Sequence, residues 1–341
     1  MRLLVTGGCG FIGSNYVHLV LREQPGDVVV NLDKLTYCGN RLNLAAVERE
    51  FGGTRYHFVQ GDIGDAALVE RIINEHGIEA VVNFAAETHV DRSIHDSAPF
   101  LTTNVMGTHV LLEAARKAGL PRFVHVSTDE VYGSLSADEA AFSEETPLRP
   151  NSPYSASKAG ADLLCRAYVK TYGLPVVVTR CSNNYGPYQF PEKLIPLMYT
   201  RAAAGEPLPV YGDGLNVRDW IFVEDHCRGV DLALRKGRPG AVYNFGGAAE
   251  RTNLEVVRAI LKTLGRPEDL VRFVADRPGH DRRYAMDFGL AAEELGFKPG
   301  VSFEQGLART LEWYQENEAW LTAVKDGSYR TFMDAWYRER A

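Results

Sequence analysis

Short apolar runs alternate with amphipathic stretches along the first half of the chain. The runs are rich in Val, Ile and Leu and have the length of strands, which predicts strands at 2–6, 28–33, 56–63, 80–86, 124–127 and 176–181. Between them, apolar residues recur at helical spacing, which predicts helices at 14–22, 65–76, 103–118 and 155–172. Strands that alternate with helices in this way favour an α/β fold with a Rossmann-type, doubly wound parallel sheet.

The second half of the chain has a different texture. Residues 183–191 and 206–214 are rich in Pro, Gly and Asn, as is typical of loops that close over a ligand. Apolar runs at 217–223 and 241–245 predict two more strands, so we expect the chain to recross the first lobe. Helices are predicted at 253–263, 289–295 and 303–315, and the aromatic and charged residues 317–341 predict a helix that packs on this lobe or on a neighbour.

These elements predict two interleaved domains. The first is expected to hold residues 1–182 together with about 217–247, and to bind a dinucleotide through the glycine-rich segment described next. The second, smaller α/β domain is expected to hold about 183–216 and 248–341, and to bind the substrate.

Three glycines follow the first predicted strand and open the first predicted helix. Gly7, Gly10 and Gly13 have the spacing G-x-x-G-x-x-G, which lets the chain turn tightly and a pyrophosphate approach backbone N–H groups at a helix start. Glycines also make ordinary turns, so the context matters. Asp33 ends the second strand, where a carboxylate accepts ribose hydroxyls and repels a 2′-phosphate. This favours NAD over NADP, and the neighbouring Lys34 weakens the preference slightly.

Asp62, after the third strand, has two physical roles open to it. Its carboxylate could reach the adenine amino group of a dinucleotide, or it could cap the helix predicted at 65–76. The sequence does not decide between them.

Reactive side chains gather after the fifth strand and at the start of the helix that follows it. Thr128, Asp129 and Glu130 are expected at the carboxyl end of a buried strand, where open α/β sheets bind their ligands. Tyr154 and Lys158 are four residues apart, so they share a helix face, and a nearby ammonium favours phenolate and lowers the pKa of the phenol. The alternative, a solvated acidic turn and a chance Tyr-Lys pair, is disfavoured by the combination.

Composition excludes several classes of protein. The 341 residues are 45% hydrophobic and 24% charged, as in soluble globular proteins, and the net charge of -7 argues against nucleic-acid binding. The five cysteines form no C-x-x-C pair, which favours reduced thiols in the cytoplasm over disulfides or a metal site, and Cys9 fits a small filler in the glycine turn. Met1 to Gly8 lacks the apolar core of a signal peptide, and no apolar run has the length of a membrane span.

Several motifs resemble the extended short-chain dehydrogenase/reductase superfamily of nucleotide-sugar enzymes and, within it, the dTDP-glucose 4,6-dehydratase family. The superfamily likeness rests on residues 6–13 and on Tyr154 with Lys158. The narrower likeness rests on the blocks 83–94, 127–133, 180–187, 190–196, 211–214 with 217–220, and 276–281. The blocks span residues 3 to about 290, so the resemblance covers most of the chain.

The resemblance implies a lyase that holds NAD tightly and regenerates it in each turnover. In the family's chemistry, the Tyr154 phenolate takes the C4 hydroxyl proton while NAD+ takes the C4 hydride, giving a 4-keto sugar. Glu130 is then the base at C5, protonated Asp129 donates to the departing C6 hydroxyl, and the hydride returns to C6. Thr128 bonds the C4 oxygen and Lys158 binds the nicotinamide ribose. The product, dTDP-4-keto-6-deoxyglucose, feeds deoxysugar biosynthesis of the dTDP-rhamnose type.

The resemblance also implies which residues contact each ligand. For NAD these are, with the glycines above, Phe11, Ile12, Asp33, Lys34, Leu35, Thr36, Asp62, Ile63, Phe84, Ala85, Ala86, Glu87, Thr88, Thr103, Tyr154, Lys158 and Asn184. For the nucleotide sugar they are Thr88, Thr128, Asn183, Lys193, Leu194, Ile195, Pro196, Leu197, Met198, Pro209, Val210, Tyr211, Arg218, Asn253, Asp276, Arg277, Pro278, Gly279 and His280.

Three of the implied features need comment. Arg218 is suited to hold the pyrophosphate bidentately, with a surface ion pair to Asp219 as the alternative. Thr88 stands where the family often has Ser, which keeps the hydroxyl and adds a methyl. The family also implies a homodimer formed by helices near 98–118 and 155–172.

Other functions stay open at this stage. A UDP-sugar 4-epimerase needs the hydride machinery but not the Asp129 and Glu130 pair. A 4,6-dehydratase acting on UDP-glucose, UDP-N-acetylglucosamine or GDP-mannose would have a similar catalytic core. Outside enzymes, a nucleotide-sugar-binding regulator would not need the intact set of reactive residues.

Overall fold

The computed structural model describes residues 1–324. A seven-stranded sheet forms the core of the first lobe, with the order β10-β6-β5-β4-β1-β2-β3 and parallel pairing throughout. Its strands are β1 (Arg2–Thr6), β2 (Val28–Asp33), β3 (Tyr56–Gln60), β4 (Ala80–Asn83), β5 (Arg122–Thr128), β6 (Val176–Cys181) and β10 (Val242–Phe245). The predicted α/β fold of Rossmann type is confirmed, and β10 returns to the large sheet as expected.

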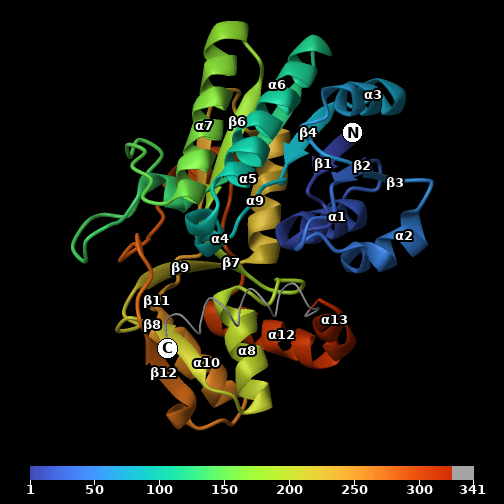
Figure 1. Cartoon of the computed structure of the whole chain (residues 1–341). Helices are drawn as coiled ribbons and strands as arrows, with labels where there is room; N and C mark the ends of the chain where they lie inside the picture. The colour runs from blue at the N-terminus through green and yellow to red at the C-terminus, as the bar shows by residue number, and fades with distance from the viewer. Residues whose placement is uncertain (325–341) are drawn as a thin grey trace.

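Helices cover both faces of this sheet (Figure 1). Apolar residues of α3 (Ala66–His76), α6 (Thr108–Lys117) and α7 (Pro153–Tyr172) pack with one set of inward-facing strand residues. Residues of α1 (Phe11–Glu23), α2 (Ala45–Phe51) and α9 (Val223–Lys236) pack with the set on the opposite face. Because both faces are covered, the central strands are buried along nearly their whole length, including the polar residues Asn31, His125 and Thr179.

Local signals fix the ends of the helices that matter for the site. A capping box between Ser152 and Ser155 starts α7, with Pro153 at its first position, and Gly173 ends it in a left-handed conformation. Asp65 caps α3 by accepting from the Leu68 N–H. The alternative that Asp62 caps this helix is therefore wrong; its carboxylate accepts from the Gly64 N–H instead.

The second lobe lies below the first in Figure 1 and has its own apolar core. A three-stranded sheet joins β7 (Asn183–Tyr185), β9 (Val217–Phe222) and β11 (Glu250–Thr252), and a pair joins β8 (Leu208–Tyr211) and β12 (Val271–Val274). The helices of this half of the chain are α8 (Leu194–Ala204), α10 (Asn253–Thr263), α11 (Gly289–Leu295), α12 (Phe303–Glu316) and α13 (Glu318–Ala323).

Two elements bear on the predicted domain division. The strand predicted at 217–223 forms β9, which pairs with β7 and β11 and not with the large sheet. Helix α11, in contrast, packs its Ala291 and Leu295 against the side chains of β6 and β10. The domain bounds stay a prediction. The helix predicted over 317–341 is present as α13, and its remainder lies outside the described residues.

The helix predicted over 103–118 has a more irregular start. Residues Leu101–Gly107 form a π-helical segment, η2, and α6 follows directly. A Cβ placed on Gly107 would lie 2.5 Å from the Ile63 Cδ1 atom, so only glycine allows this close packing. The short elements η1 (Arg41–Leu44), α4 (Val90–His95), α5 (Ala98–Phe100), η3 (Asp129–Tyr132) and η4 (Glu268–Leu270) complete the fold. No helix among residues 1–324 combines the length and apolar character needed to span a membrane.

Candidate active site

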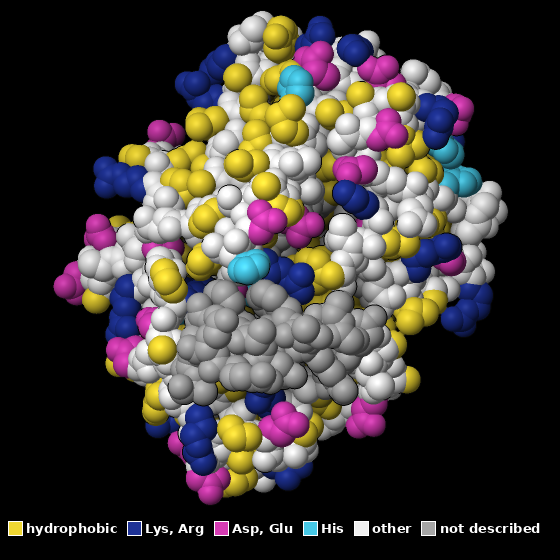
Figure 2. Space-filling view, viewed as in Figure 1, with side chains coloured by type: hydrophobic (Ala, Val, Ile, Leu, Met, Phe, Trp, Pro, Cys, Tyr) yellow, Lys and Arg dark blue, Asp and Glu magenta, His cyan; other side chains and the backbone are white. Residues whose placement is uncertain are grey.

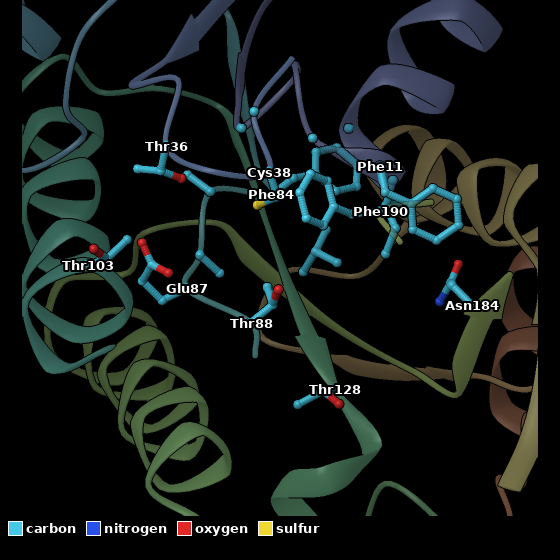
Figure 3. Close-up of a pocket in the computed structure, with 18 of the residues that line it drawn as sticks. Phe11, Thr36, Cys38, Phe84, Glu87, Thr88, Thr103, Thr128, Asn184 and Phe190 are labelled. Atoms are coloured by element: carbon cyan, nitrogen blue, oxygen red, sulfur yellow. The ribbon is translucent and has the colours of Figure 1, made fainter. Parts of the chain in front are cut away.

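A cavity of about 280 Å³ lies at the carboxyl ends of β1, β2, β4 and β5. It is lined by the glycine loop, the residues that follow these strands, and the segment after β6, which approaches from the second lobe. Figure 3 shows Thr36, Glu87 and Thr103 on one side of this space, and Asn184 on the other, with Thr128 at the end of β5. This is the edge at which parallel α/β sheets bind their ligands.

The glycine loop forms a cradle that side chains would fill. Gly7 has a φ of 68°, and a Cβ placed on it would lie 2.7 Å from the Ala85 nitrogen. A Cβ on Gly13 would lie 2.2 Å from the Gly7 carbonyl oxygen. Helix α1 begins directly after Gly10, with no side chain capping it. The loop therefore leaves room at a helix N-terminus, which is the arrangement that receives a pyrophosphate.

The predicted cofactor residues line this cavity, with the exception of Leu35. Leu35 packs instead toward the core beneath α1 and α2, and its N–H donates to Asp33 Oδ1 at 2.8 Å. Leu35 has a φ of 58°, and its side chain points away from the cavity that Lys34 and Thr36 line. Leu35 is therefore not part of the lining, and its predicted contact with NAD stays a prediction.

Asp33 occupies the end of β2, as expected for a ribose-binding carboxylate. It is buried, and accepts from the Cys9 N–H at 2.9 Å as well as from Leu35, while burial raises its pKa. Lys34 pairs with Asp62 at 2.7 Å. The expected effect of Lys34 on the preference for NAD over NADP stays a prediction.

Thr128, Asp129 and Glu130 follow β5 directly into the cavity. The Thr128 hydroxyl donates to Asp129 Oδ1 at 3.1 Å and accepts from the Glu130 N–H at 3.3 Å. Asp129 is 3% exposed, so the alternative of a solvated acidic turn is wrong. Within residues 1–324, the second carboxylate oxygen of Asp129 has no hydrogen-bond partner.

The two adjacent carboxyl groups have different electrostatic surroundings. Burial, followed by repulsion from Glu130, raises the pKa of Asp129 well above its usual value. Burial also raises the pKa of Glu130, but the charges of Arg277, Lys193 and Arg218 oppose that rise. Of the pair, Asp129 is therefore the one that holds a proton most firmly, and Glu130 is the one that ionises first.

Tyr154 and Lys158 extend from the first turns of α7 into the same cavity. The Tyr154 ring packs edge-on against Phe100 at 6.3 Å, and the Lys158 ammonium donates to the Val126 carbonyl oxygen at 2.7 Å. Burial raises the pKa of Tyr154 well above its usual value, with Glu130 adding to the rise and the Thr128 hydroxyl opposing it. The lowering of this pKa expected from Lys158 does not prevail in this structure, because burial is the largest influence on the phenol.

The predicted substrate residues fall into two groups. Thr88, Thr128, Asn183 and Lys193 line the cavity, and Lys193 Nζ donates to the Thr88 carbonyl oxygen at 3.0 Å. The remaining residues lie on the second lobe beyond the cavity lining. Among them, the side chains of Ile195, Leu197, Met198 and Val210 pack in the apolar core of that lobe. Substrate contact by this second group stays a prediction.

Arg218 is buried beneath the second group. It donates to the carbonyl oxygens of Val217 at 2.7 Å and Asp281 at 3.0 Å, and its guanidinium stacks 4.1 Å from the Tyr284 ring centre. Asp219 accepts instead from two backbone N–H groups, those of Gly247 and Ala249. The alternative of a surface ion pair between Arg218 and Asp219 is therefore wrong.

Contacts through Asp91 connect the second lobe to α4 of the first. Arg277 Nη1 lies 3.0 Å from Asp91 Oδ1, and the Tyr211 hydroxyl donates to Asp91 Oδ2 at 3.3 Å. His280 Nδ1 lies 2.6 Å from Asp276 Oδ1. Three residues predicted to hold the substrate, Tyr211, Arg277 and His280, thus lie close together, since the rings of Tyr211 and His280 also meet edge-on.

Sequence reasoning missed part of the lining: Leu32, Cys38, Gly39, Gly61, Val126, Ser127, Cys181, Ser182, Gln189, Phe190 and Glu192. Five of these, Leu32, Gly61, Ser127, Ser182 and Glu192, adjoin a predicted residue, and that position was the available signal. Glu192 lies in the 190–196 block, accepts from the Tyr37 hydroxyl at 2.9 Å, and has a pKa raised to about 7 by burial. Among the residues described, no group of three His, Cys, Asp or Glu side chains is arranged to hold a metal ion.

With this fold and this cavity, the protein falls into the class of dinucleotide-binding enzymes built on an extended short-chain dehydrogenase/reductase scaffold. A family model described as GDP-mannose 4,6 dehydratase matches residues 4–310, and the chain belongs to this family.

Individual proteins show more specifically what this chain is similar to. The chain is 56% identical over 345 aligned positions to a dTDP-glucose 4,6-dehydratase from Xanthomonas campestris pv. campestris strain B100, covering 96% of this chain and 97% of that protein. It is 55% identical to the dTDP-glucose 4,6-dehydratase from Streptomyces venezuelae solved with NAD bound, with a TM-score of 0.91 and coverage of 95% and 100%. It is 32% identical to a UDP-glucose 4-epimerase from Thermotoga maritima, with a TM-score of 0.86 and coverage of 93% and 100%.

Proposed function

We propose that the chain is a dTDP-glucose 4,6-dehydratase, an NAD-dependent hydro-lyase that converts dTDP-glucose into dTDP-4-keto-6-deoxyglucose. One observation carries the proposal. Asp129 and Glu130, adjacent carboxyl groups with unequal tendencies to hold a proton, line the same cavity as Tyr154 and Lys158. The relatives described above, at identities of 56% and 55%, support the same assignment.

The cavity fits NAD on its own geometry. The cradle made by Gly7 and Gly13 matches a pyrophosphate, and Asp33 at the end of β2 matches the adenosine ribose. Bound NAD+ supplies a hydride acceptor for C4 and later a hydride donor for C6. We assign Lys158 to the nicotinamide ribose, because its buried ammonium lines this part of the cavity.

Tyr154 is the proposed base for the C4 hydroxyl. Its hydroxyl lies in a buried, cavity-lining position, and the Thr128 hydroxyl acts on it as a hydrogen-bond partner. Because burial disfavours the phenolate in the structure, removal of the proton depends on positive charge near the ring. Lys158 provides such a charge from the next turn of α7, and Thr128 hydrogen-bonds the C4 oxygen.

Asp129 and Glu130 are the proposed acid and base of the elimination. The C4 ketone acidifies the C5 hydrogen, which the Glu130 carboxylate removes. Asp129, kept protonated by burial and by the neighbouring Glu130, donates its proton to the C6 hydroxyl as it leaves as water. The elimination therefore uses the difference in pKa between the two carboxyl groups.

Cations around the second lobe are suited to the substrate's diphosphate. Lys193 lines the cavity, and Arg218 and Arg277 are near enough to Glu130 to influence its pKa. A guanidinium holds a phosphate through two parallel hydrogen bonds, so we assign the diphosphate to Arg218.

The nucleotide base is tested by offering the purified protein dTDP-glucose, UDP-glucose, UDP-N-acetylglucosamine and GDP-mannose separately, and assaying each for a 4-keto-6-deoxy product. The proposal predicts the highest kcat/KM with dTDP-glucose. A higher value with another nucleotide would reassign the substrate, and formation of dTDP-galactose from dTDP-glucose would establish epimerisation instead.

A homodimer is the proposed assembly. Large apolar side chains are exposed on η2 and α7, among them Leu101 at 53%, Met106 at 56%, Leu163 at 57% and Tyr172 at 55%. Apolar side chains gather over α6 and α7 in Figure 2. A patch of this kind marks a protein interface. Leu163→Glu should convert the dimer to a monomer in light scattering, whereas Leu215→Glu, at an exposed site on the second lobe, should leave it dimeric.

We further propose that the protein works in the cytoplasm and supplies a deoxysugar pathway of the dTDP-rhamnose type. All five cysteines are unpaired, which fits a reducing compartment. A 4-keto-6-deoxy sugar is an activated intermediate, so its formation calls for enzymes that epimerise or reduce it.

A further inference from the structure

A buried carboxylate that the proposed reaction does not use lies one turn beyond Lys158 on α7. Tyr154, Lys158 and Asp162 recur at intervals of four residues, so their side chains lie along one face of the helix. They are 8%, 4% and 3% exposed, respectively. An ionisable group buried this deeply is costly to keep unless it has a role or a partner.

Two strands of the large sheet hold the Asp162 carboxylate in place. Arg180, on β6, donates its Nε–H to Asp162 Oδ2 at 2.8 Å and its Nη1–H to the Tyr132 hydroxyl at 2.8 Å. His125, on β5, places its Nε2 atom 3.7 Å from Asp162 Oδ1. Among residues 1–324, the Oδ1 atom of Asp162 has no hydrogen-bond partner. The negative charge on this oxygen is therefore not neutralised by a short contact.

The hydrogen bonds around His125 set its charge and its tautomer. The Thr6 hydroxyl donates to Asn83 Oδ1 at 2.6 Å, so the Asn83 amide nitrogen is the atom 3.2 Å from His125 Nδ1. Nδ1 therefore accepts, and the proton lies on Nε2, which faces Asp162. Burial holds the pKa of His125 well below its usual value. His125 is thus neutral: it directs an N–H group at Asp162 but brings no positive charge.

The groups that act on Lys158 leave Asp162 as its source of negative charge. From α7 these are Asp162 and Cys165, and from β6 Cys181. Burial raises the pKa of Cys165 well above its usual value and that of Cys181 to about 12, so both thiols are neutral. Burial lowers the pKa of Lys158, and Asp162 is the first influence that opposes this.

The other elements packed on α7 do not change this balance. The π-helical segment η2 contains no titratable residue. On α6, Glu113 and His109 contact Tyr168, ten residues further along α7 than Lys158. In η3, Asp129 is the protonated acid of the site, and the Glu130 carboxylate acts on Tyr154 and not on Lys158.

Helix α4, which also packs on α7, carries three titratable residues that have other surroundings. Asp91 pairs with Arg277, the Arg92 guanidinium stacks on the Tyr37 ring, and His95 is exposed.

We propose that Asp162 is a positioning residue for the hydride-transfer step: its carboxylate, fixed by Arg180, keeps the Lys158 ammonium charged while that ammonium donates to the Val126 carbonyl oxygen in the cavity that Tyr154 lines. This rests on the proposed function in so far as the assisted step is oxidation at C4. Asp162 acts through Lys158, without touching the sugar.

Asp162→Asn is the direct test. Without the carboxylate, Lys158 loses its proton at lower pH, so the alkaline limb of the kcat profile should move down by about one pH unit, the usual effect of a nearby opposite charge. KM should change little, because the substrate does not contact this residue. Asp162→Glu, which keeps a carboxylate, should return the alkaline limb of the kcat profile toward the pH at which it lies in wild type.

Arg180→Gln is a second test, in which the alkaline limb of the kcat profile should shift in the opposite direction. It keeps the proposal testable if Asp162→Asn does not fold. Removing the guanidinium leaves the Asp162 charge to Lys158 alone, so the alkaline limb should move up. The matched control is Asp231→Asn, which removes another buried carboxylate paired with an arginine, Arg235 at 2.8 Å on α9. It should lower the thermal midpoint without moving the limb.

A measurement that needs no turnover separates this inference from the proposed function. In protein labelled with 13C-lysine, the Lys158 side-chain resonance, assigned by its loss in Lys158→Met, reports protonation directly. A lower midpoint in Asp162→Asn than in wild type supports the role of Asp162 even if dTDP-glucose is not the substrate. Equal midpoints in the two proteins, or limbs that move together in Asp162→Asn and Arg180→Gln, would overturn it.

Discussion

The Thr128 hydroxyl donates to Asp129 Oδ1 at 3.1 Å, which leaves Asp129 Oδ2 as the oxygen without a hydrogen-bond partner among residues 1–324. One oxygen of Asp129, the proposed acid, is thus oriented by Thr128. The other oxygen is available to carry the proton that is donated to the substrate. The first three predictions below follow from this arrangement and from the glycine cradle opposite it.

Asp129→Asn and Glu130→Gln should each reduce dehydration by about 10²-fold or more, the usual contribution of a positioned acid or base. Both variants keep Tyr154 and Lys158, so oxidation at C4 should persist and appear as transient absorbance of reduced nicotinamide in stopped-flow. Asp138→Asn, a change at an exposed acid, is the matched control and should behave as wild type. Product formation at the wild-type rate in either site variant would remove that carboxyl group from the mechanism.

Tyr154→Phe should block the first step itself. The change removes the hydroxyl and keeps the ring contact with Phe100, so the fold should be preserved. Rapid-mixing absorbance should then show reduced nicotinamide forming at least about 10²-fold more slowly than in wild type. Undiminished formation would mean that another group takes the C4 hydroxyl proton.

Gly13→Ala should weaken NAD retention strongly, because its Cβ would lie 2.2 Å from the Gly7 carbonyl oxygen and would push the loop out of shape. Gly26→Ala is the matched control, since a Cβ there meets nothing within 4 Å. NAD content after gel filtration, measured by absorbance of the released cofactor, distinguishes the two. Equal NAD content in both variants would contradict the proposed pyrophosphate cradle.

Burial of Asp129 should also appear as a pH-dependent cost in stability. Its pKa in the folded protein lies above the unfolded value of about 3.9, so ionisation favours the unfolded chain as the pH rises through that value. Relative to wild type, Asp129→Asn should gain thermal stability progressively as the pH rises above about 4, by about 1.4 kcal/mol for each unit of pKa shift relieved. A difference in Tm that stays constant over this range would mean that Asp129 is not held protonated.

The fold was predictable where the signal was local. The strands at 2–6, 28–33 and 176–181 and the helices at 253–263 and 289–295 have the predicted bounds, because apolar runs and helix caps are properties of short segments. Strands β8 and β12, which pair with each other, were missed, and β8 lies in the segment 206–214 that was predicted wrongly to be a loop throughout. Strands β7 and β11 were also missed. Each is three residues long and exists because β9 lies between them, which the sequence pattern does not encode.

The site residues were likewise predictable where the signal was local and were missed where it was not. The glycine loop and the side chains of Thr128, Asp129, Glu130, Tyr154 and Lys158 were recognisable from spacing, and the structure brings them to one cavity. Glu192 was missed, since its place in the lining depends on how the segment after β6 folds back. The protonation preference of Tyr154 was expected with the wrong sign, because it depends on burial that only the folded chain reveals.

The most direct test of the account follows the hydrogen at C4. The protein is incubated with dTDP-glucose carrying deuterium at C4, and the label in the product is located by NMR. The account predicts a 4-keto-6-deoxy sugar with the deuterium at C6. Deuterium found again at C4, in dTDP-galactose, would contradict it.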